Sequence, residues 1–237
     1  MLGSLSVGAI IPALNEEGVI GSTLDAIPRD IVDVIWVADN GSCDDTAAEA
    51  KAHGARVVEE RRRGYGAACQ AAIEQMRRTG PPDVVVFIDA DGSQPIDELR
   101  MLLGPIVDDE ADFVMGIRRF EDTPMHVSIG NRVSCAILRR LTGRRFGDLG
   151  PFRAVRFESL SGLELDDLDY GWNVQMQARA VAAGLRIREI GVSHRPRQAG
   201  RSKISGSLVG TVRGGSKIIM TSLREGWRAR RTMRSHG

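Results

Sequence analysis

The sequence predicts an α/β protein with a mixed, mainly parallel sheet and helices on both faces. Short apolar runs rich in β-branched residues recur through the first 116 residues, and segments with helical periodicity separate them. Strict alternation of strand and helix favours parallel strands joined by crossovers. The length of 237 residues fits one domain of ordinary size.

The elements follow in order along this first part. Strands are expected at residues 7–11, 34–38, 55–59, 84–88 and 112–116, and helices at about 20–27, 45–53, 67–78 and 95–107. Ser42 and Asp45 have capping-box spacing before the second helix, and Pro95 occupies a favoured first-turn position. Polar loops follow the strands, at the edge of the sheet where ligands bind in such folds.

The alternation ends after residue 116. Residues 117–125 look irregular, 126–141 helical, and 146–154 form a Gly/Pro-punctuated loop that enters a short extended piece. A helix at about 172–183 and a half-buried strand at 185–192 complete the expected domain.

The charge of the chain is unevenly distributed. Residues 195–237 contain 11 Lys and Arg and one acid, a net charge of +10, so residues 1–194 carry −9. A basic arm on an acidic body predicts an anionic partner: phosphate groups, an anionic membrane surface or nucleic acid. Interleaved apolar and basic residues in the arm suit an interfacial amphipathic helix, and a disordered solvated tail is the alternative.

The three cysteines, Cys43, Cys69 and Cys135, form neither a zinc pattern nor a disulfide framework. A reducing cytoplasm is the expected location. The N-terminus lacks a signal-peptide pattern, and no stretch approaches the roughly 20 apolar residues of a membrane span. Any membrane contact would therefore be peripheral, at the inner face.

Two carboxylates end the buried run at residues 84–88. Asp89 and Asp91 are two residues apart, so an extended chain projects them to the same side. Such a pair suits Mg²⁺, which takes one or two carboxylates together with the oxygens of a substrate diphosphate. A solvated acidic turn is the alternative. Likewise, Arg61–Arg63 beside Gly64 and Gly66 suit a phosphate or form a solvated basic turn.

Four motifs stand at strand ends in the order residues 10–16, 37–46, 63–66 and 89–92. Together they resemble family 2 glycosyltransferases of the GT-A fold, which is Rossmann-like. Residues 148–153, 170–172 and 201–203 resemble the polyprenol-phosphate branch, which is dolichol-phosphate mannosyltransferase-like. The resemblance covers about residues 6–207. It implies a glycosyltransferase domain at 1–207, with a nucleotide-sugar half at about 6–116 and an acceptor half at about 117–207, and a basic helix or tail at 208–237.

The resemblance implies inverting transfer of a hexose from a UDP- or GDP-linked sugar, with Mg²⁺ or Mn²⁺. Asp91 would bind the metal, and Asp89 would share it or bind the donor. The cation would neutralise charge on the leaving diphosphate. The implied nucleotide-sugar contacts are Pro12, Ala13, Asn15, Glu16, Asp39, Gly64, Gly66, Asp89 and Ala90.

Inverting displacement also needs a base or an ionised nucleophile. Asp148 resembles the carboxylate of the family's acceptor loop and is the first candidate, and Asp169 is the second. A polyprenyl phosphate acceptor is already anionic and would need no strong base. Candidates for holding the acceptor phosphate or the donor diphosphate are Arg118, Arg132, Arg153, Arg201 and Lys203.

The chain departs from the branch's pattern in two motifs. Ser93 replaces a common Gln, with Gln94 one position later, and Gln175 replaces the usual Glu after Tyr-Gly-Trp. A base at Gln175 is therefore not expected. The departure at Ser93 leaves the third metal contact open.

Three other functions stay open at this level. The same fold could act on a small soluble or glycan acceptor, or it could be a nucleotidyltransferase. A nucleic-acid-binding protein could use the basic arm, although the acidic body argues against it. A homo-oligomer is compatible with the sequence.

Overall fold

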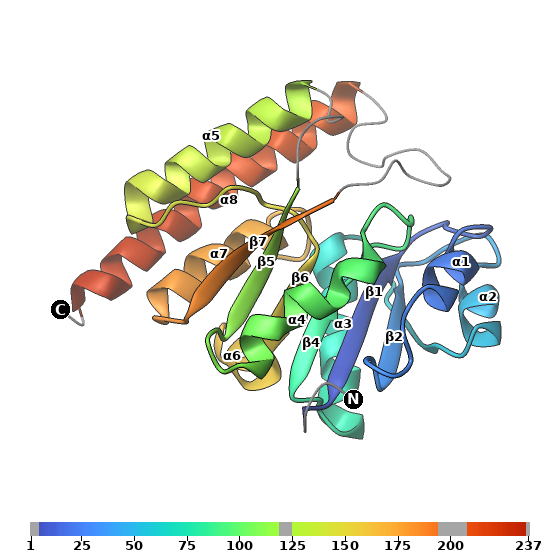
Figure 1. Ribbon diagram of the computed structural model, residues 1–237. Helices are drawn as coiled ribbons and strands as arrows, with labels where there is room; N and C mark the ends of the chain where they lie inside the picture. Colours follow the sequence, from blue (N-terminus) through green and yellow to red (C-terminus); the bar gives the residue numbers. More distant parts are fainter. Residues whose placement is uncertain (1–4, 119–124, 194–207, 236–237) are drawn as a thin grey trace.

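The computed structural model is a seven-stranded sheet with helices on both faces, which confirms the predicted fold class (Figure 1). The structure describes residues 5–118, 125–193 and 208–235. The strands are β1 (Val7–Ala13), β2 (Val34–Asp39), β3 (Arg56–Glu59), β4 (Val84–Phe87), β5 (Phe113–Arg118), β6 (Arg153–Arg156) and β7 (Ile187–Val192). The helices are α1 (Ile20–Asp25), α2 (Thr46–Ala52), α3 (Tyr65–Thr79), η1 (Ile96–Glu98), α4 (Leu99–Val107), α5 (Met125–Thr142), α6 (Phe157–Gly162), α7 (Trp172–Ala182) and α8 (Leu208–Ser235).

The strand order is β3-β2-β1-β4-β6-β5-β7. β1 pairs in parallel with β2 and β4, and β5 pairs in parallel with β7. β6 is antiparallel to both of its neighbours, β4 and β5. The short extended piece expected after residue 152 therefore lies in the interior of the sheet and makes it mixed.

The side chains of β4 alternate between two cores, one on each face of the sheet. Val84 and Val86 join the core with α1, α2 and α4, whereas Val85 and Phe87 join the core with α3, α6 and α7. All four are at most 1% exposed. The apolar run is therefore a strand covered on both faces, and the two carboxylates that follow it emerge at the edge of the sheet.

The predicted capping box is wrong. α2 begins after Asp45 without a side-chain capping hydrogen bond. The Ser42 hydroxyl instead donates to the Asp39 carboxylate. The Asp39 carboxylate at the end of β2 thus takes the Ser42 hydroxyl that would otherwise cap α2.

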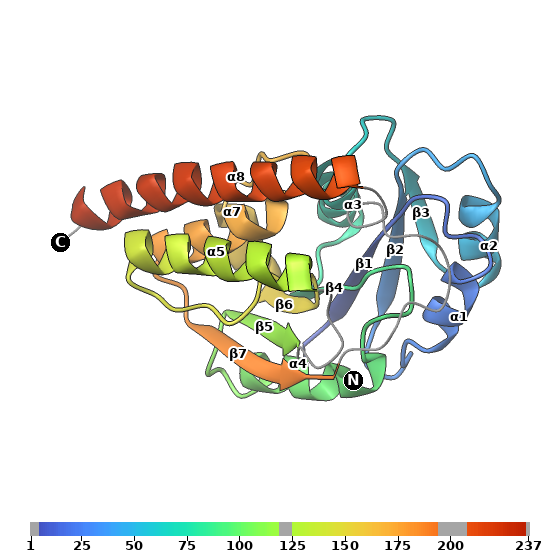
Figure 2. The same cartoon turned by 90° about the horizontal axis from the view of Figure 1, so that it is seen from above.

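The C-terminal arm is a 28-residue helix, α8, that packs along α5 and α7 (Figure 2). Its inner face is buried, and Ala229 belongs to the same core as Leu138 of α5 and Trp172 of α7. A Cβ added to Gly226 would lie 2.7 Å from the Leu141 side chain. The described part of the arm is therefore a packed element and not a disordered tail. Within the described ranges, no helix is long and apolar enough to cross a membrane.

Candidate active site

The carboxyl ends of β1, β2 and β4 meet at one edge of the sheet. The Asn40 N–H donates to the Ala13 carbonyl at 2.8 Å, and the Ile88 N–H donates to the Ile10 carbonyl at 3.0 Å. The parallel register brings the loops after these three strands together. Pro12, Ala13, Asn15, Glu16, Asp39, Asp89, Ala90 and Asp91, all predicted from sequence, lie in or beside these loops.

Ser42 connects the predicted nucleotide-pocket residues of the first two loops. Its N–H donates to Asp39 Oδ1 at 3.2 Å, and its hydroxyl oxygen accepts from the Asn15 N–H at 2.9 Å. Asn15 Oδ1 in turn accepts from the Cys43 N–H at 2.9 Å. In the same way, the Glu16 N–H donates to Thr46 Oγ1 at 2.8 Å. The loops therefore present Asp39, which is 6% exposed, in a fixed orientation.

Asn40 fixes the loop that leads into α3, and it is not among the site residues predicted from the sequence. Its Oδ1 accepts from the Gly64 N–H at 2.7 Å. Its Nδ2 donates to the carbonyls of Glu60 at 3.0 Å and Arg62 at 2.7 Å. An Asn with these three bonds cannot be replaced by Asp, which lacks the donors. The available signal in the sequence was the position of Asn40 directly after Asp39, where a strand end places polar side chains at the predicted site.

Gly64 and Gly66 make room for another segment of the protein. A Cβ on Gly64 or Gly66 would lie 2.0 Å from the carbonyl oxygens of Leu168 and Asp167, respectively. The Ala67 N–H donates to the Leu168 carbonyl at 2.9 Å. The acidic segment 164–169 therefore packs against the start of α3, at the positions that the resemblance assigns to the nucleotide.

Local hydrogen bonds hold the loop of Asp89 and Asp91. The Asp89 N–H donates to Gln94 Oε1 at 3.0 Å, and Asp91 Oδ1 accepts from the Ser93 N–H at 3.0 Å. Gln94 is 7% exposed, and its buried Nε2 has no hydrogen-bond partner among the described residues. Among the described residues, no group of three or more acidic, His or Cys side chains could hold a metal by itself. Two carboxylates at adjacent positions of this edge offer the oxygen ligands that fit a Mg²⁺ or Mn²⁺ ion whose coordination a diphosphate completes.

Arg118 and Asp148 form a bidentate ion pair. Arg118 Nε lies 2.7 Å from Asp148 Oδ2, and Nη2 lies 2.8 Å from Oδ1. Burial alone would lower the pKa of Arg118, but the hydrogen bonds to Asp148 and the charges of Asp148 and Asp89 raise it. Arg118 and Asp89 line one small pocket together with Gln94 and Gly150. The pair thus places a fixed cation in the same pocket as the Asp89 carboxylate.

Asp148 itself is 1% exposed and also accepts from the Leu149 N–H at 2.7 Å. Both of its oxygens are committed to donors. This geometry suits a residue that positions Arg118 better than one that removes a proton from an acceptor.

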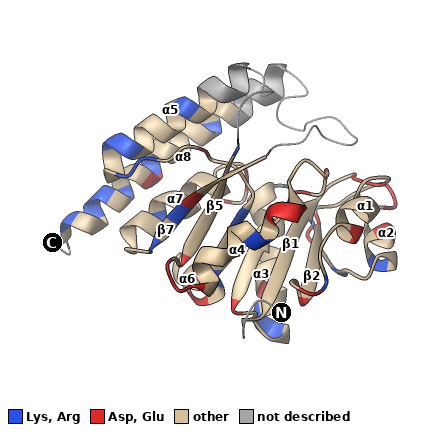
Figure 3. Ribbon diagram, viewed as in Figure 1, with Lys and Arg blue, Asp and Glu red and all other residues tan. Residues whose placement is uncertain are grey.

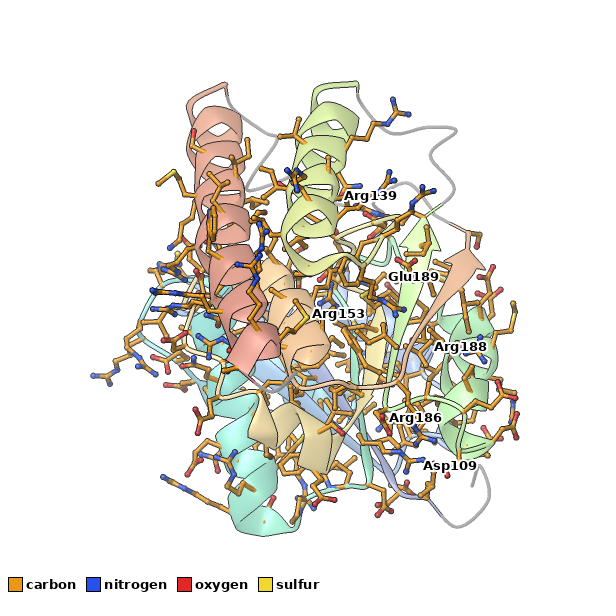
Figure 4. All side chains as sticks on the ribbon, turned by 90° about the vertical axis from the view of Figure 1, so that its left-hand side faces the viewer. Asp109, Arg139, Arg153, Arg186, Arg188 and Glu189 are labelled. Atoms are coloured by element: carbon orange, nitrogen blue, oxygen red, sulfur yellow. The ribbon has the colours of Figure 1, made fainter. Side chains whose placement is uncertain are left out.

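Arg153 is fully buried, which argues against its predicted contact with a phosphate. Its guanidinium donates to the carbonyls of Asn173 and Leu149, both at 3.3 Å, and of Gly150. It also lies 5.7 Å from the centre of the Phe113 ring, and burial lowers its pKa to about 10. Figure 4 shows Arg153 inside the molecule, whereas Arg186 and Asp109 lie at the opposite end of the sheet. Arg153 therefore shapes the loop after Asp148.

Asp169 lies away from this pocket, in the acidic segment. Its Oδ2 is 3.4 Å from Lys217 Nζ of α8, and its N–H donates to Asp167 Oδ1 at 2.9 Å. Arg132 is exposed on α5. Arg201 and Lys203 lie outside the described residues.

Comparisons with known proteins agree with this architecture. The model for glycosyl transferase family 2 matches residues 9–161. An uncharacterized glycosyltransferase of Mycobacterium tuberculosis is 39% identical over 210 residues, which cover 87% of this chain and 93% of the relative.

The chain belongs to glycosyltransferase family 2.

Two further relatives of this family 2 glycosyltransferase differ in their acceptors. The dolichyl-phosphate hexose transferase of Haloferax volcanii is 31% identical over 226 residues, which cover 92% of this chain and 95% of the relative. Glucosyl-3-phosphoglycerate synthase of M. tuberculosis, solved with Mn²⁺, UDP-glucose and phosphoglyceric acid, superposes with a TM-score of 0.78 at 25% identity. That match covers 94% of this chain and 80% of the synthase. The family 2 glycosyltransferase described here therefore has the GT-A fold.

The acidic segment is tied to α7 and α8 by a polar network that the sequence did not reveal. Gln175 is fully buried and accepts the N–H groups of Asp166 and Asp167 at 2.8 and 2.9 Å. Its Nε2 donates to Asp166 at 2.6 Å and to Glu225 at 3.3 Å. Gln175 thus supports the segment structurally, which agrees with the expectation that it is not a base.

Proposed function

We propose that this glycosyltransferase transfers a hexose from a UDP- or GDP-linked sugar to the phosphate of a polyprenyl phosphate, with Mg²⁺ or Mn²⁺. The observation that carries the donor half is the Asp89–Asp91 pair just after β4, of which Asp89 lines one pocket with Arg118. Transfer from a nucleotide diphosphate needs a cation at the leaving group and an anion-binding group on the acceptor side. This edge of the sheet offers residues for both.

Asp91 would hold the cation, with Asp89 beside it. When bound, the cation supplies Lewis-acid stabilisation of the departing diphosphate. The loops of Asn15 and Asp39 would bind the nucleotide through groups that their hydrogen bonds already fix. Binding by prearranged groups costs little reorganisation.

Arg118 would bind the acceptor phosphate, held in place by Asp148. A phosphate oxygen is already anionic at neutral pH, so it can attack the sugar carbon without a general base. Asp148 then has a positioning role, consistent with its burial and its bonds to Arg118. Asp169 is not required for this mechanism.

The lipid acceptor is supported by a sequence match that extends over nearly the whole of a relative named for a lipid phosphate. The match to the dolichyl-phosphate hexose transferase covers 95% of that relative. The sequence match to glucosyl-3-phosphoglycerate synthase of M. tuberculosis is shorter: it is 34% identical over 143 residues, which cover 42% of that synthase. A small phosphorylated acceptor is still a second candidate, because solved structures of that synthase superpose over 94% of this chain. Either acceptor carries a phosphate for Arg118.

A labelled-donor assay tests the proposal. A thermal-shift screen of UDP-, GDP- and dTDP-sugars with Mn²⁺ first identifies the donor, because binding to the folded state raises the Tm. The donor is then incubated with polyprenyl phosphate or with 3-phosphoglycerate. We expect label in the organic phase with the lipid. Label confined to the water-soluble fraction would reject the lipid acceptor, and release of inorganic diphosphate would indicate a nucleotidyltransferase.

Asp91→Ala is expected to abolish transfer while the Tm stays close to wild type. Asp108→Ala, at an exposed position after α4, is the matched control and should retain full activity. Transfer by Asp91→Ala at the wild-type rate in the presence of EDTA would refute the metal assignment.

A further inference from the structure

The outer face of α8 carries an apolar stripe. Met220, Leu223 and Trp227 are 66%, 39% and 54% exposed. Their spacing of three and four residues places them one above another on a single helix face. Three of the six large apolar side chains exposed in the described part of the chain therefore gather on one helix. Isolated exposed apolar residues are ordinary, but a continuous stripe indicates an interaction site.

Basic side chains surround this stripe, which we call the α8 stripe (Met220, Leu223 and Trp227). Arg230 stacks on Trp227, with its guanidinium carbon 5.6 Å from the ring centre. The single acid of α8, Glu225, is 1% exposed and points inward, toward Arg179 at 3.1 Å. The other basic residues of this part of α8 are Lys217, Arg224, Arg228, Arg231 and Arg234.

Three of these basic groups are already paired: Lys217 with Asp169 at 3.4 Å, Arg224 with Glu225 at 2.9 Å and Arg228 with Glu225 at 3.1 Å. Arg231 and Arg234 have no carboxylate partner among the described residues. Free positive charge therefore concentrates toward the C-terminal half of the helix.

The neighbouring helix extends the basic surface. α5 lies side by side with α8, and Lys and Arg collect on both helices (Figures 2 and 3). Arg132, Arg139 and Arg140 of α5 are exposed, and Val133 is 40% exposed. The acidic surplus of residues 1–194 lies on the rest of the molecule.

The combination of an apolar stripe and a basic border selects one partner chemistry. A second copy of the chain would bring the same basic face opposite itself in a two-fold contact, which like charges disfavour. Nucleic acid would match the arginines but leave Met220 and Leu223 without apolar partners. An anionic bilayer satisfies both, because acyl chains receive the apolar side chains and headgroups receive the arginines.

We propose that the α8 stripe and its basic border dock this enzyme on an anionic membrane surface. The proposal deepens the proposed function, because it identifies the surface through which the enzyme would reach a lipid acceptor. Only its biological purpose rests on the proposed function, and vesicle binding is tested independently of it. Trp227 enters the interface, Met220 and Leu223 enter beside it, and Arg230, Arg231 and Arg234 contact the headgroups.

Tryptophan fluorescence provides a direct readout. Trp36 and Trp172 are 7% and 1% exposed, whereas Trp227 is 54% exposed, so a change in tryptophan environment on binding reports on α8. Vesicles of phosphatidylcholine with about 30% phosphatidylglycerol are titrated into the 237-residue protein, and sedimentation measures the bound fraction. We expect a blue shift and cosedimentation with these vesicles. Neither is expected with pure phosphatidylcholine.

Two variants separate the apolar and the basic contributions. Met220→Ser/Leu223→Ser keeps the reporter and should weaken binding at least about tenfold, because roughly 25 cal/mol is lost per Å² of apolar surface. Arg230→Gln/Arg231→Gln/Arg234→Gln should weaken it roughly 100-fold, at about fivefold per arginine near an anionic surface. Met101→Ser is the matched control, because Met101 is 54% exposed on α4, outside the stripe. It should bind like wild type.

Several results would overturn the proposal. These are equal binding to neutral and anionic vesicles, wild-type binding by both α8 variants, or loss of binding in Met101→Ser. Sedimentation of the wild type as a dimer that Met220→Ser/Leu223→Ser converts to a monomer would instead assign the stripe to a second copy. Circular dichroism and an unchanged Tm establish that the variants fold, as expected for exposed positions.

Transfer to a short, water-soluble prenyl phosphate without vesicles separates this proposal from the proposed function. Transfer without vesicle binding would reject the docking surface alone. Vesicle binding without transfer to any prenyl phosphate would reject the lipid acceptor alone.

Discussion

Replacing Gly66 with Ala tests whether the glycines before α3 make room for the acidic segment. The added Cβ would lie 2.0 Å from the Asp167 carbonyl oxygen, where ordinary contacts begin at 3.4 Å, so the two backbones must separate by about 1.4 Å. Overpacking of this kind costs about 1–3 kcal/mol. The separation also breaks the 2.9 Å bond from the Ala67 N–H to the Leu168 carbonyl, which contributes about 1 kcal/mol.

The total of about 2–4 kcal/mol corresponds to a fall in Tm of roughly 4–16 °C for a chain of this size. Differential scanning fluorimetry and urea denaturation measure it. Gly162→Ala is the matched control, because α6 is helical there and, apart from its chain neighbours and the helix's own backbone, no described atom lies within 4 Å of the added Cβ. It should be neutral or stabilise by about 0.5–1 kcal/mol. If the Tm of Gly66→Ala lies within about 2 °C of wild type, the packing argument is refuted. If this variant then loses donor binding alone, Gly66 is needed for the close approach of the nucleotide.

Three other substitutions probe the polar groups described above. Asp148→Asn should lower the free energy of unfolding by about 1–3 kcal/mol and raise KM for the acceptor, because Arg118 loses its ionic partner, while the pH profile of transfer keeps its shape. Loss of the fall in activity at acid pH would indicate a general base instead. Gln175→Glu should lower the free energy of unfolding in urea by about 2–4 kcal/mol, because it buries a further carboxylate beside Glu225, and an unchanged urea midpoint would contradict this. Burial alone would raise the pKa of Glu225, but hydrogen bonds led by that from Arg179 lower it below 4.5, so wild type should lose stability as the pH falls below that value. Glu225→Gln should flatten this dependence in Tm measurements between about pH 3 and 7, and parallel curves for the two proteins would count against the assignment.

The hydrophobic periodicity of the segments and the order of strands and helices along the chain were sufficient to predict the first half of the fold. The apolar run that ends at Asp89 alternates between two cores, so its pattern encoded both its burial and the position of the carboxylates. Strand ends with polar motifs then predicted which loops would meet. These are local signals whose geometry follows from the strand period.

The second half depends on long-range pairing, which a local pattern does not encode. β6 begins and ends with arginines, yet it lies between β4 and β5. Arg153 is an example, because an arginine predicts exposure and this one is 0% exposed, held by carbonyls from two other segments. Ser42 had two available partners, and the sequence could not show that Asp39 would take precedence over the helix.

Because α8 follows every other described element in the sequence and packs against two of them, its place in the core has a consequence for biosynthesis. Until residues 208–235 leave the ribosome, Leu141 lacks its contact with Gly226, and Arg179 lacks Glu225. The inner faces of α5 and α7 stay open to solvent for that time, and such surfaces recruit chaperones and proteases. A nascent chain of this enzyme therefore completes this core only after α8 has emerged, and chains truncated before or within α8 should be removed by quality control even though every candidate catalytic residue has already been made.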